Sequence, residues 1–205
     1  MVPAIHRRAM LGLIDSAALL ARPGKSQSAG GTNVSSPISN TASMHHAVLI
    51  GASAESAYNA LTTQEGISAW WTPDVRAKPV RDSIARIPFG PDYFKEMKIT
   101  GLEPSKRVGW LCITGVEEWV GTTISLNLEP GNQTTMLSSH PELKDQIRQQ
   151  ANPDTQTLVT LVHDDWRAYT PMFAECNYTW GLFLKSLKLF CETGTGRPWP
   201  HQHQI

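Results

Sequence analysis

The sequence predicts an α+β fold in which an antiparallel sheet packs against one long helix near the C-terminus. Between Thr170 and Thr193, large apolar residues recur at intervals of three and four, the spacing that places them on one side of a helix. Upstream of this segment, short β-rich runs alternate apolar and polar residues, as strands of a half-exposed antiparallel sheet do. The two apolar faces each need a partner, so we expect a curved sheet that grips the helix.

The composition fits one globular domain with an N-terminal extension. The 205 residues can bury a sizeable core, and equal numbers of basic and acidic residues, eighteen of each, argue against nucleic acid as a partner. Seven tryptophans are many for this length, and such rings fill cores or line apolar pockets. The predicted helix would hold Cys176 and Cys191 about 22 Å apart, so we expect reduced thiols and a cytoplasmic protein.

Residues 1–43 read differently from the rest of the chain. From Lys25 to Ser43 the residues are mostly Ser, Gly, Asn, Thr and Pro, which predicts disorder. Before this stretch, Arg7-Arg8 and a short apolar run loosely resemble a twin-arginine or organelle-targeting leader, and the run is too short to span a membrane. We prefer a non-functional extension. The domain is then expected over 44–200, with 201–205 as a tail.

The predicted domain begins with a strand and two short helices. Residues 46–50 are a short β-rich run, and residues 52–55 start a helix that carries Tyr58 and Leu61. A second short helix is expected from about Gln64 to Trp71, because Thr72-Pro73 would stop it.

Four further strands are expected next. The fourth of them, residues 119–129, puts Thr122, Ile124, Leu126 and Leu128 on one face and polar residues on the other, which predicts one dry and one wet face. Turn residues such as Gly90-Pro91 separate these strands. The four runs are 83–89, 93–103, 107–113 and 119–129.

An insertion over 131–154 interrupts the strands. Pro141 suits the first turn of a helix, and the residues that follow it are mostly good helix formers, so we expect a short surface helix that ends before Asn152-Pro153. The last strand, Thr155 to Asp164, places four residues on one face: Thr157, Val159, Leu161 and His163.

The long helix has both of its ends encoded in the sequence. Thr170 is a good N-cap, Pro171 fits the first helical position, and Gly194 suits the left-handed residue that closes a helix. A sheet wrapped around one helix leaves space that small helices do not fill, and this space is the candidate pocket.

Four stretches of the sequence resemble a known family. Residues 60–72, which include Trp70-Trp71, look like the signature of proteins related to the Hsp90 ATPase activator, within the START and Bet v 1-like (SRPBCC) superfamily. Residues 103–110 resemble its mid-sheet turn and strand, residues 157–163 its last strand, and residues 177–194 its closing helix. The resemblance covers about residues 45–199.

The resemblance implies a helix-grip fold with a hydrophobic cavity between sheet and helix. It does not select one function, because members bind lipids, hormones or polyketides, assist a chaperone or catalyse cyclisation. The activator is similar to this chain only over its C-terminal domain, and we expect no counterpart of its N-terminal chaperone-binding domain. The insertion around residues 141–150 also departs from the family pattern.

The candidate site is a set of rings with few polar groups, drawn from the elements that should surround the cavity. Such a set suits a mostly apolar small molecule, although each member taken alone is more often core. The ligand-binding candidates are Trp71, Phe89, Trp110, Trp119, Ile124, His163, Phe173, Asn177 and Trp180.

His163 is the one candidate for acid–base chemistry. If it faces the cavity it could move a proton or orient a ligand, and a structural histidine held by a hydrogen bond is the alternative that we prefer. The pairs at His45-His46 and His201–His203 lack accompanying ligands, so we expect no metal, and no motif indicates a cofactor.

Three functions follow from these observations. The first is binding of a small hydrophobic ligand, lipid or polyketide-like, without catalysis. The second is a cyclase or aromatase that uses the same pocket. The third is an interaction protein associated with an Hsp90-type chaperone.

Overall fold

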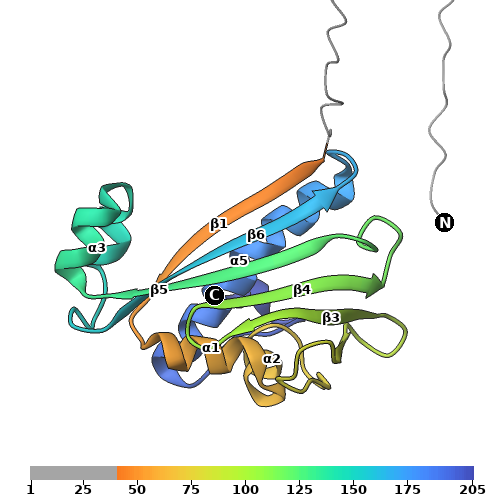
Figure 1. The fold of residues 1–205 in the computed structure, drawn as a ribbon, viewed down its shortest axis with the longest axis horizontal. Coiled ribbons are helices and arrows are strands. Elements are labelled where there is room, and N and C mark those ends of the chain that lie inside the picture. The colour runs from red at the N-terminus through yellow and green to blue at the C-terminus, as the bar shows by residue number, and fades with distance from the viewer. Residues whose placement is uncertain (1–40) are drawn as a thin grey trace, which may run out of the picture. The chain divides into compact units, whose positions relative to one another are not determined.

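The computed structural model describes residues 41–205, and within them the chain forms a six-stranded antiparallel sheet with the spatial order β1-β6-β5-β4-β3-β2 (Figure 1). The long helix α5 lies behind the sheet in this view, and α1 and α2 contact it on the same side. The predicted α+β helix-grip fold is therefore confirmed. The strands are β1 (Ala42–Ile50), β2 (Ile84–Pro88), β3 (Phe94–Glu103), β4 (Arg107–Thr114), β5 (Thr123–Gly131) and β6 (Gln156–Trp166).

The first strand starts slightly earlier than the sequence predicted. β1 begins at Ala42, four residues before the expected strand and two before the expected start of the domain, because Ala42 and Met44 both pack into the core. The remainder of the expected extension or leader, residues 1–40, lies outside the described residues.

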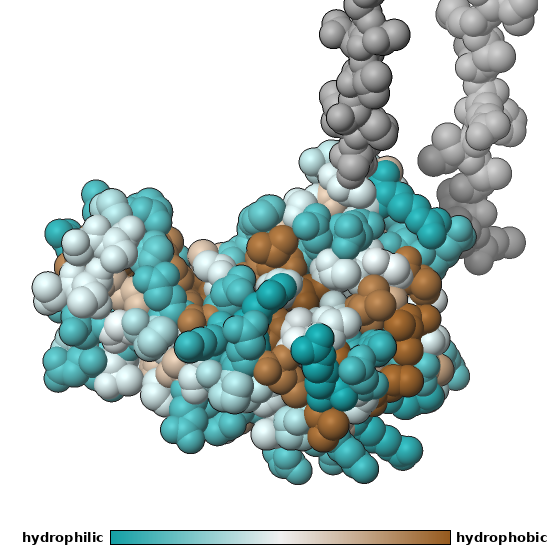
Figure 2. Space-filling model, viewed as in Figure 1, coloured by the Kyte–Doolittle hydropathy of each residue, from teal (hydrophilic) through white to brown (hydrophobic). Residues whose placement is uncertain are grey.

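The sheet has the two-sided character that alternation predicted. In β5, Ile124, Leu126 and Leu128 are buried and face the core, whereas Asn127 and Glu129 are exposed. Figure 2 shows the opposite, outer face, where hydrophilic and hydrophobic side chains are mixed.

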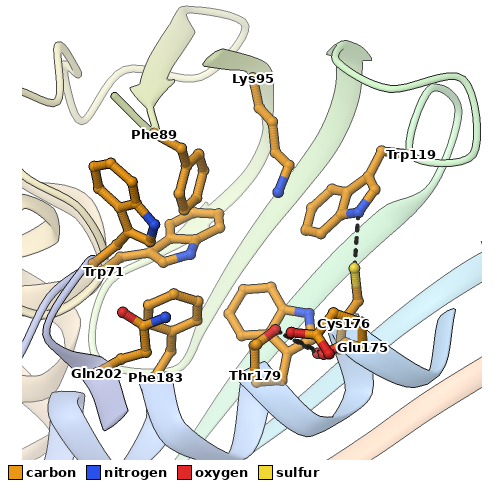
Figure 3. Close-up of a pocket in the computed structure, with 11 residues that line it drawn as sticks. Trp71, Phe89, Lys95, Trp119, Glu175, Cys176, Thr179, Phe183 and Gln202 are labelled. Carbon is orange, nitrogen blue, oxygen red and sulfur yellow. Dashed lines mark hydrogen bonds between the residues drawn. The ribbon is translucent and has the colours of Figure 1, made fainter. Parts of the chain in front are cut away.

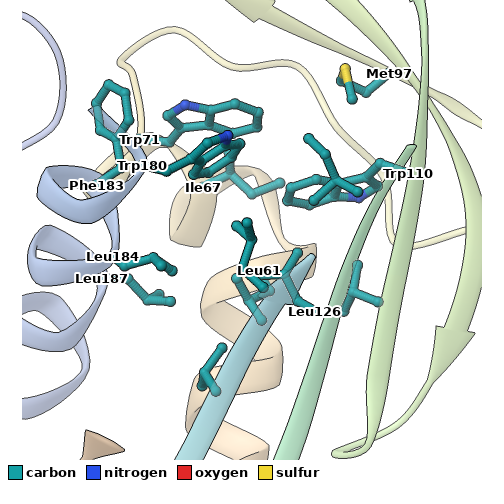
Figure 4. Close-up of a cluster of buried hydrophobic side chains, with 14 of the residues drawn as sticks. Leu61, Ile67, Trp71, Met97, Trp110, Leu126, Trp180, Phe183, Leu184 and Leu187 are labelled. Carbon is teal, nitrogen blue, oxygen red and sulfur yellow. The ribbon is translucent and has the colours of Figure 1, made fainter. Parts of the chain in front are cut away.

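Helix α5 (Pro171–Thr193) has the predicted ends. The Thr170 hydroxyl accepts a hydrogen bond from the Phe173 N–H, and Gly194 closes the helix with a φ of 79°. Its buried side faces the sheet and includes Trp180, Leu184 and Leu187. In Figure 4, Leu184 and Leu187 point toward Leu61 of α1, and Trp180 lies beside Trp71. Among the described residues, no helix is long and apolar enough to cross a membrane.

Two glycines of α5 lead to opposite predictions. A Cβ added to the exposed Gly181 would meet nothing within 4 Å, so Gly181→Ala should stabilise the protein by about 0.5–1 kcal/mol through helix propensity. Gly194→Ala should instead destabilise it by about 1 kcal/mol, because alanine disfavours the left-handed conformation. Urea unfolding measures both, and a loss of stability in Gly181→Ala would show that this face of the helix is not free.

The short helices α1 (Ala54–Thr62) and α2 (Gln64–Trp70) pack tightly on each other. Ser53 and Thr63 cap their N-termini with side-chain oxygens. A Cβ on Gly66 would come within 2.6 Å of the Asn59 carbonyl oxygen, so only glycine allows α2 to approach α1 this closely. This junction fixes the position of Trp71, which caps the C-terminus of α2.

The insertion is helical, but it holds more than the one predicted helix. α3 (Gln133–Ser139), a 3₁₀ turn η1 (Pro141–Leu143) and α4 (Lys144–Arg148) follow one another, and the sequence pattern predicted only the part after Pro141. A separate small apolar cluster of Leu49, Met136, Ile147 and Leu158 holds them against the sheet. α3 lies at the far end of the sheet from α2 (Figure 1).

Candidate functional site

A pocket of about 210 Å³ lies between the sheet and α5 (Figure 3). Its walls come from the end of α2, from the segment between β2 and β3, from β3, from the connection between β4 and β5, from α5 and from the C-terminal segment that ends in a 3₁₀ turn, η2 (Gln202–Gln204). The lining residues are Trp71, Phe89, Lys95, Trp119, Glu175, Cys176, Thr179, Trp180, Phe183, Trp199 and Gln202.

Aromatic rings dominate this lining and support one another. The ring of Trp71 stacks on Trp110 with centroids 5.6 Å apart and lies 5.2 Å from Trp180. Phe89 contacts Trp71 and Trp199 edge to face. Rings held by other rings keep their orientation, so the apolar wall is preorganised.

Lys95 is the one basic residue of the lining. Its side chain points into the pocket in Figure 3, and the residue is only 8% exposed. Nζ lies 3.5 Å from the ring centroid of Trp119 and 4.5 Å from that of Phe89. Among residues 41–205, no carboxylate forms an ion pair with it. Because burial disfavours the ammonium form, the pKa of Lys95 falls to about 8.

His163 does not line the pocket but contacts the rings of Trp119 and Trp180, and it is the centre of a hydrogen-bond chain. Trp180 Nε1–H donates to His163 Nδ1 over 2.9 Å, and the Thr122 hydroxyl donates to the Trp119 carbonyl oxygen. Thr122 Oγ1 must therefore accept from His163 Nε2–H, 2.9 Å away, and this fixes the tautomer. Burial lowers the pKa of His163 to about 3, so the ring stays neutral.

The thiol of Cys176 is a further polar group of the lining. It accepts a hydrogen bond from Trp119 Nε1 at 3.1 Å, and burial raises its pKa. At the rim, the exposed Glu175 marks the side on which the pocket reaches solvent. Among the described residues, no group of His, Cys, Asp and Glu could hold a metal ion.

The structure brings four of the nine predicted ligand-binding residues together in this pocket: Trp71, Phe89, Trp119 and Trp180. Trp110 lies behind Trp71, and Ile124 is in the core. Phe173 packs against Trp166 and Tyr169. Asn177 is exposed and hydrogen-bonds His46. His163 is fully buried with both nitrogens engaged.

Sequence reasoning missed Lys95 and the C-terminal contribution. Lys95 alternates in phase with Met97 and Ile99, so a lysine in the apolar phase of a strand was a readable signal. Trp199 was not among the predicted site residues, Gln202 falls in the expected tail, and no sequence pattern indicates that either residue returns to the pocket. They reach the pocket because the Trp199 N–H donates to the Trp71 carbonyl oxygen, 2.9 Å away.

The fold and the pocket define a helix-grip domain of the START and Bet v 1-like (SRPBCC) superfamily. The family model described as activator of Hsp90 ATPase homolog 1-like protein matches residues 51–176, and the chain belongs to this family. A comparison with curated proteins found no match.

Solved structures agree with this assignment. The Aha1 dimer from Colwellia psychrerythraea shares 34% identity over 76% of this chain and 99% of that chain, with a TM-score of 0.59. A conserved protein of unknown function from Enterococcus faecalis is 19% identical over 78% and 77% of the two chains, with a TM-score of 0.55. CalU16 from Micromonospora echinospora is 15% identical over 79% and 80%, with a TM-score of 0.51. The latter two show similarity of fold alone.

Proposed function

We propose that this domain binds a small, largely apolar molecule that carries a ring. The observation that supports the proposal is the ring-lined pocket of about 210 Å³ with a single buried amine inside it. A cavity of about 150 Å³ accepts benzene. The volume therefore suits one or two rings, and we narrow the expected ligand from a lipid or polyketide to a molecule of that size.

Apolar contact alone would give weak binding. Burying about 150 Å² of ring surface contributes about 4 kcal/mol, which corresponds to a dissociation constant near 1 mM before the cost of association. Tighter binding needs polar contacts, and Lys95 and Gln202 are two polar residues of the lining that could supply them. The Gln202 Oε1 atom is buried without a hydrogen-bond partner, so a ligand donor would satisfy it.

A pocket-filling substitution tests the proposal. Thr179→Phe should place a ring in the cavity and weaken the saturable quenching of tryptophan fluorescence by benzyl alcohol by at least about tenfold, a loss of about 1.4 kcal/mol. Ala174→Phe adds the same ring at an exposed position of α5 and should bind as the wild type does. If benzyl alcohol and related one- and two-ring compounds bind neither protein, the pocket is not a ligand site.

The natural ligand can be sought in the protein purified from its own host. Native mass spectrometry should show one retained small molecule per chain, and extraction would give its chemical class. An acyl chain much larger than two rings would contradict the proposed size limit.

A second candidate function is association with an Hsp90-type chaperone. The observations that favour it are the match to the family of activator of Hsp90 ATPase homolog 1-like proteins and the 34% identity to Aha1 from Colwellia psychrerythraea. Co-purification with the host's Hsp90-type chaperone from a lysate, retained in Thr179→Phe, would support a role that is independent of the pocket.

A cyclase that uses His163 is not proposed, because both ring nitrogens are already engaged in hydrogen bonds inside the protein.

A further inference from the structure

Lys95 is a charged residue that is buried at the pocket, where its charge is costly. A lysine in the apolar phase of β3 gives up hydration, and no acidic side chain among the described residues compensates its charge. Its Nζ lies within 3.5 Å of the Trp119 ring centroid, at the inner wall of the pocket (Figure 3). A ligand that fills the cavity would therefore contact Nζ of Lys95.

The surroundings disfavour an anionic ligand. Aromatic faces carry negative potential, and the faces of Trp119 and Phe89 lie beside Nζ. The indole N–H groups of Trp119 and Trp180 already donate inside the protein, so neither of these two donors is available to an anion. At the rim, Glu175 adds a negative charge that would repel an anion.

A neutral carbonyl compound fits these surroundings better. An aryl ring would lie among the aromatic side chains, and its carbonyl carbon could approach Nζ. Once joined to Lys95, the protonated imine keeps a positive charge at the position where the faces of Trp119 and Phe89 favour a cation. We propose that Lys95 forms an imine with a small aromatic aldehyde or ketone bound in this pocket. This inference rests on the proposed function.

The reaction needs no oxidant, reductant or further reactant. The lone pair of neutral Nζ attacks the carbonyl carbon, and the oxygen takes up a proton to give a carbinolamine. The C–O bond then breaks, the C=N bond forms, and both amine protons leave with the oxygen as water. The protonated imine takes its additional proton from solvent.

The chemistry of the neighbouring groups supports the step. With a pKa of about 8, roughly a tenth of the Lys95 side chains carry a neutral amine at pH 7. Burial raises the pKa values of Cys112 and Cys176, so these thiols stay protonated and compete poorly for the carbonyl.

The test is reductive trapping in the full chain. The protein is treated with benzaldehyde and sodium cyanoborohydride at pH 7, and the products are identified by intact mass and peptide mapping. We expect one benzyl group per chain, located on Lys95, added at least about tenfold faster than on surface lysines. Lys95→Arg and Lys95→Met should both lose this label. Lys98→Arg removes a surface lysine of the same strand and should keep it.

Benzyl alcohol separates failure of this inference from failure of the proposed function. It fills the pocket without a carbonyl group, so it should slow the labelling of Lys95 and leave surface labelling unchanged. If benzyl alcohol binds saturably while Lys95 is labelled no faster than surface lysines, the imine is wrong and the binding function stands. If neither benzyl alcohol nor benzaldehyde binds, the proposed function fails as well.

Discussion

Replacing His163 with alanine is expected to lower the free energy of unfolding by about 3–5 kcal/mol, since it creates a core cavity and removes two hydrogen bonds. Trp180 Nε1 would lose its acceptor, and the Thr122 hydroxyl would lose its donor, both in the dry interior. His163→Phe keeps most of the volume and loses only the hydrogen bonds, so it should cost about 2 kcal/mol. Urea unfolding at pH 7.5 gives both values.

The same histidine should make the protein sensitive to acid. Its folded-state pKa of about 3 lies below the ordinary value of 6.5, so the unfolded chain takes up a proton that the folded chain refuses. The stability loss is absent above pH 6.5, grows as the pH falls towards 3 and amounts to about 2 kcal/mol at pH 5. The pH dependence of His163→Phe should lack this component.

His140 is the control for this pH effect, because the shift of its pKa has the opposite direction. A hydrogen bond from His140 to Glu129, aided by charge, raises the pKa of His140, so it contributes stability below its unfolded pKa that is lost as the pH rises through the folded one. His140→Gln should therefore make the protein more acid-sensitive than the wild type.

The His163 prediction can fail in one clear way. If the stability of His163→Phe falls between pH 7.5 and pH 5 as the stability of the wild type does, then His163 is not kept neutral by the fold.

Much of the fold was predictable because local signals and long-range packing agree here. Helix α5 begins at Pro171 and ends at Thr193, where a capping threonine and a closing glycine mark its boundaries. The alternation in β5 gave the buried face correctly, since antiparallel strands of a half-exposed sheet carry this pattern. These elements depend on residues that are neighbours in sequence.

The site was less predictable because it depends on distant residues that meet only in the folded chain. Phe89, Lys95 and Trp119 come from three segments that the sheet register brings together. The return of the C-terminal segment depends on Gly196, where a Cβ would come within 2.3 Å of the Ala69 carbonyl oxygen. No periodicity encodes such a close approach. His163 likewise meets Trp180 in the core only because sheet and helix pack at one particular separation.

The second large effect is a gain of stability. Lys95→Met should raise the free energy of unfolding by about 2 kcal/mol at pH 7, although it removes the amine of the proposed site. The fall of the pKa from 10.5 to about 8 corresponds to a cost of about 3 kcal/mol for burying the ammonium, and contact with the Trp119 and Phe89 rings offsets about 1 kcal/mol of it. Methionine has a similar shape and carries no charge.

The pH dependence distinguishes this cause from better packing. The cost of Lys95 is fully present below pH 8 and disappears as the pH rises to 10.5, so the advantage of Lys95→Met should shrink over that range. Lys98→Met, at a solvent-exposed ion pair on the same strand, should change stability by less than about 1 kcal/mol. If Lys95→Met were more stable than the wild type by the same amount at pH 7 and pH 10, burial of the ammonium group would not be the cause of the gain. A destabilised Lys95→Met variant would show that the aromatic faces more than compensate for the hydration that Lys95 loses.

The expected result is a protein that is more stable without the reactive amine. It would mean that Lys95 is kept at the expense of stability, as residues that serve a ligand are.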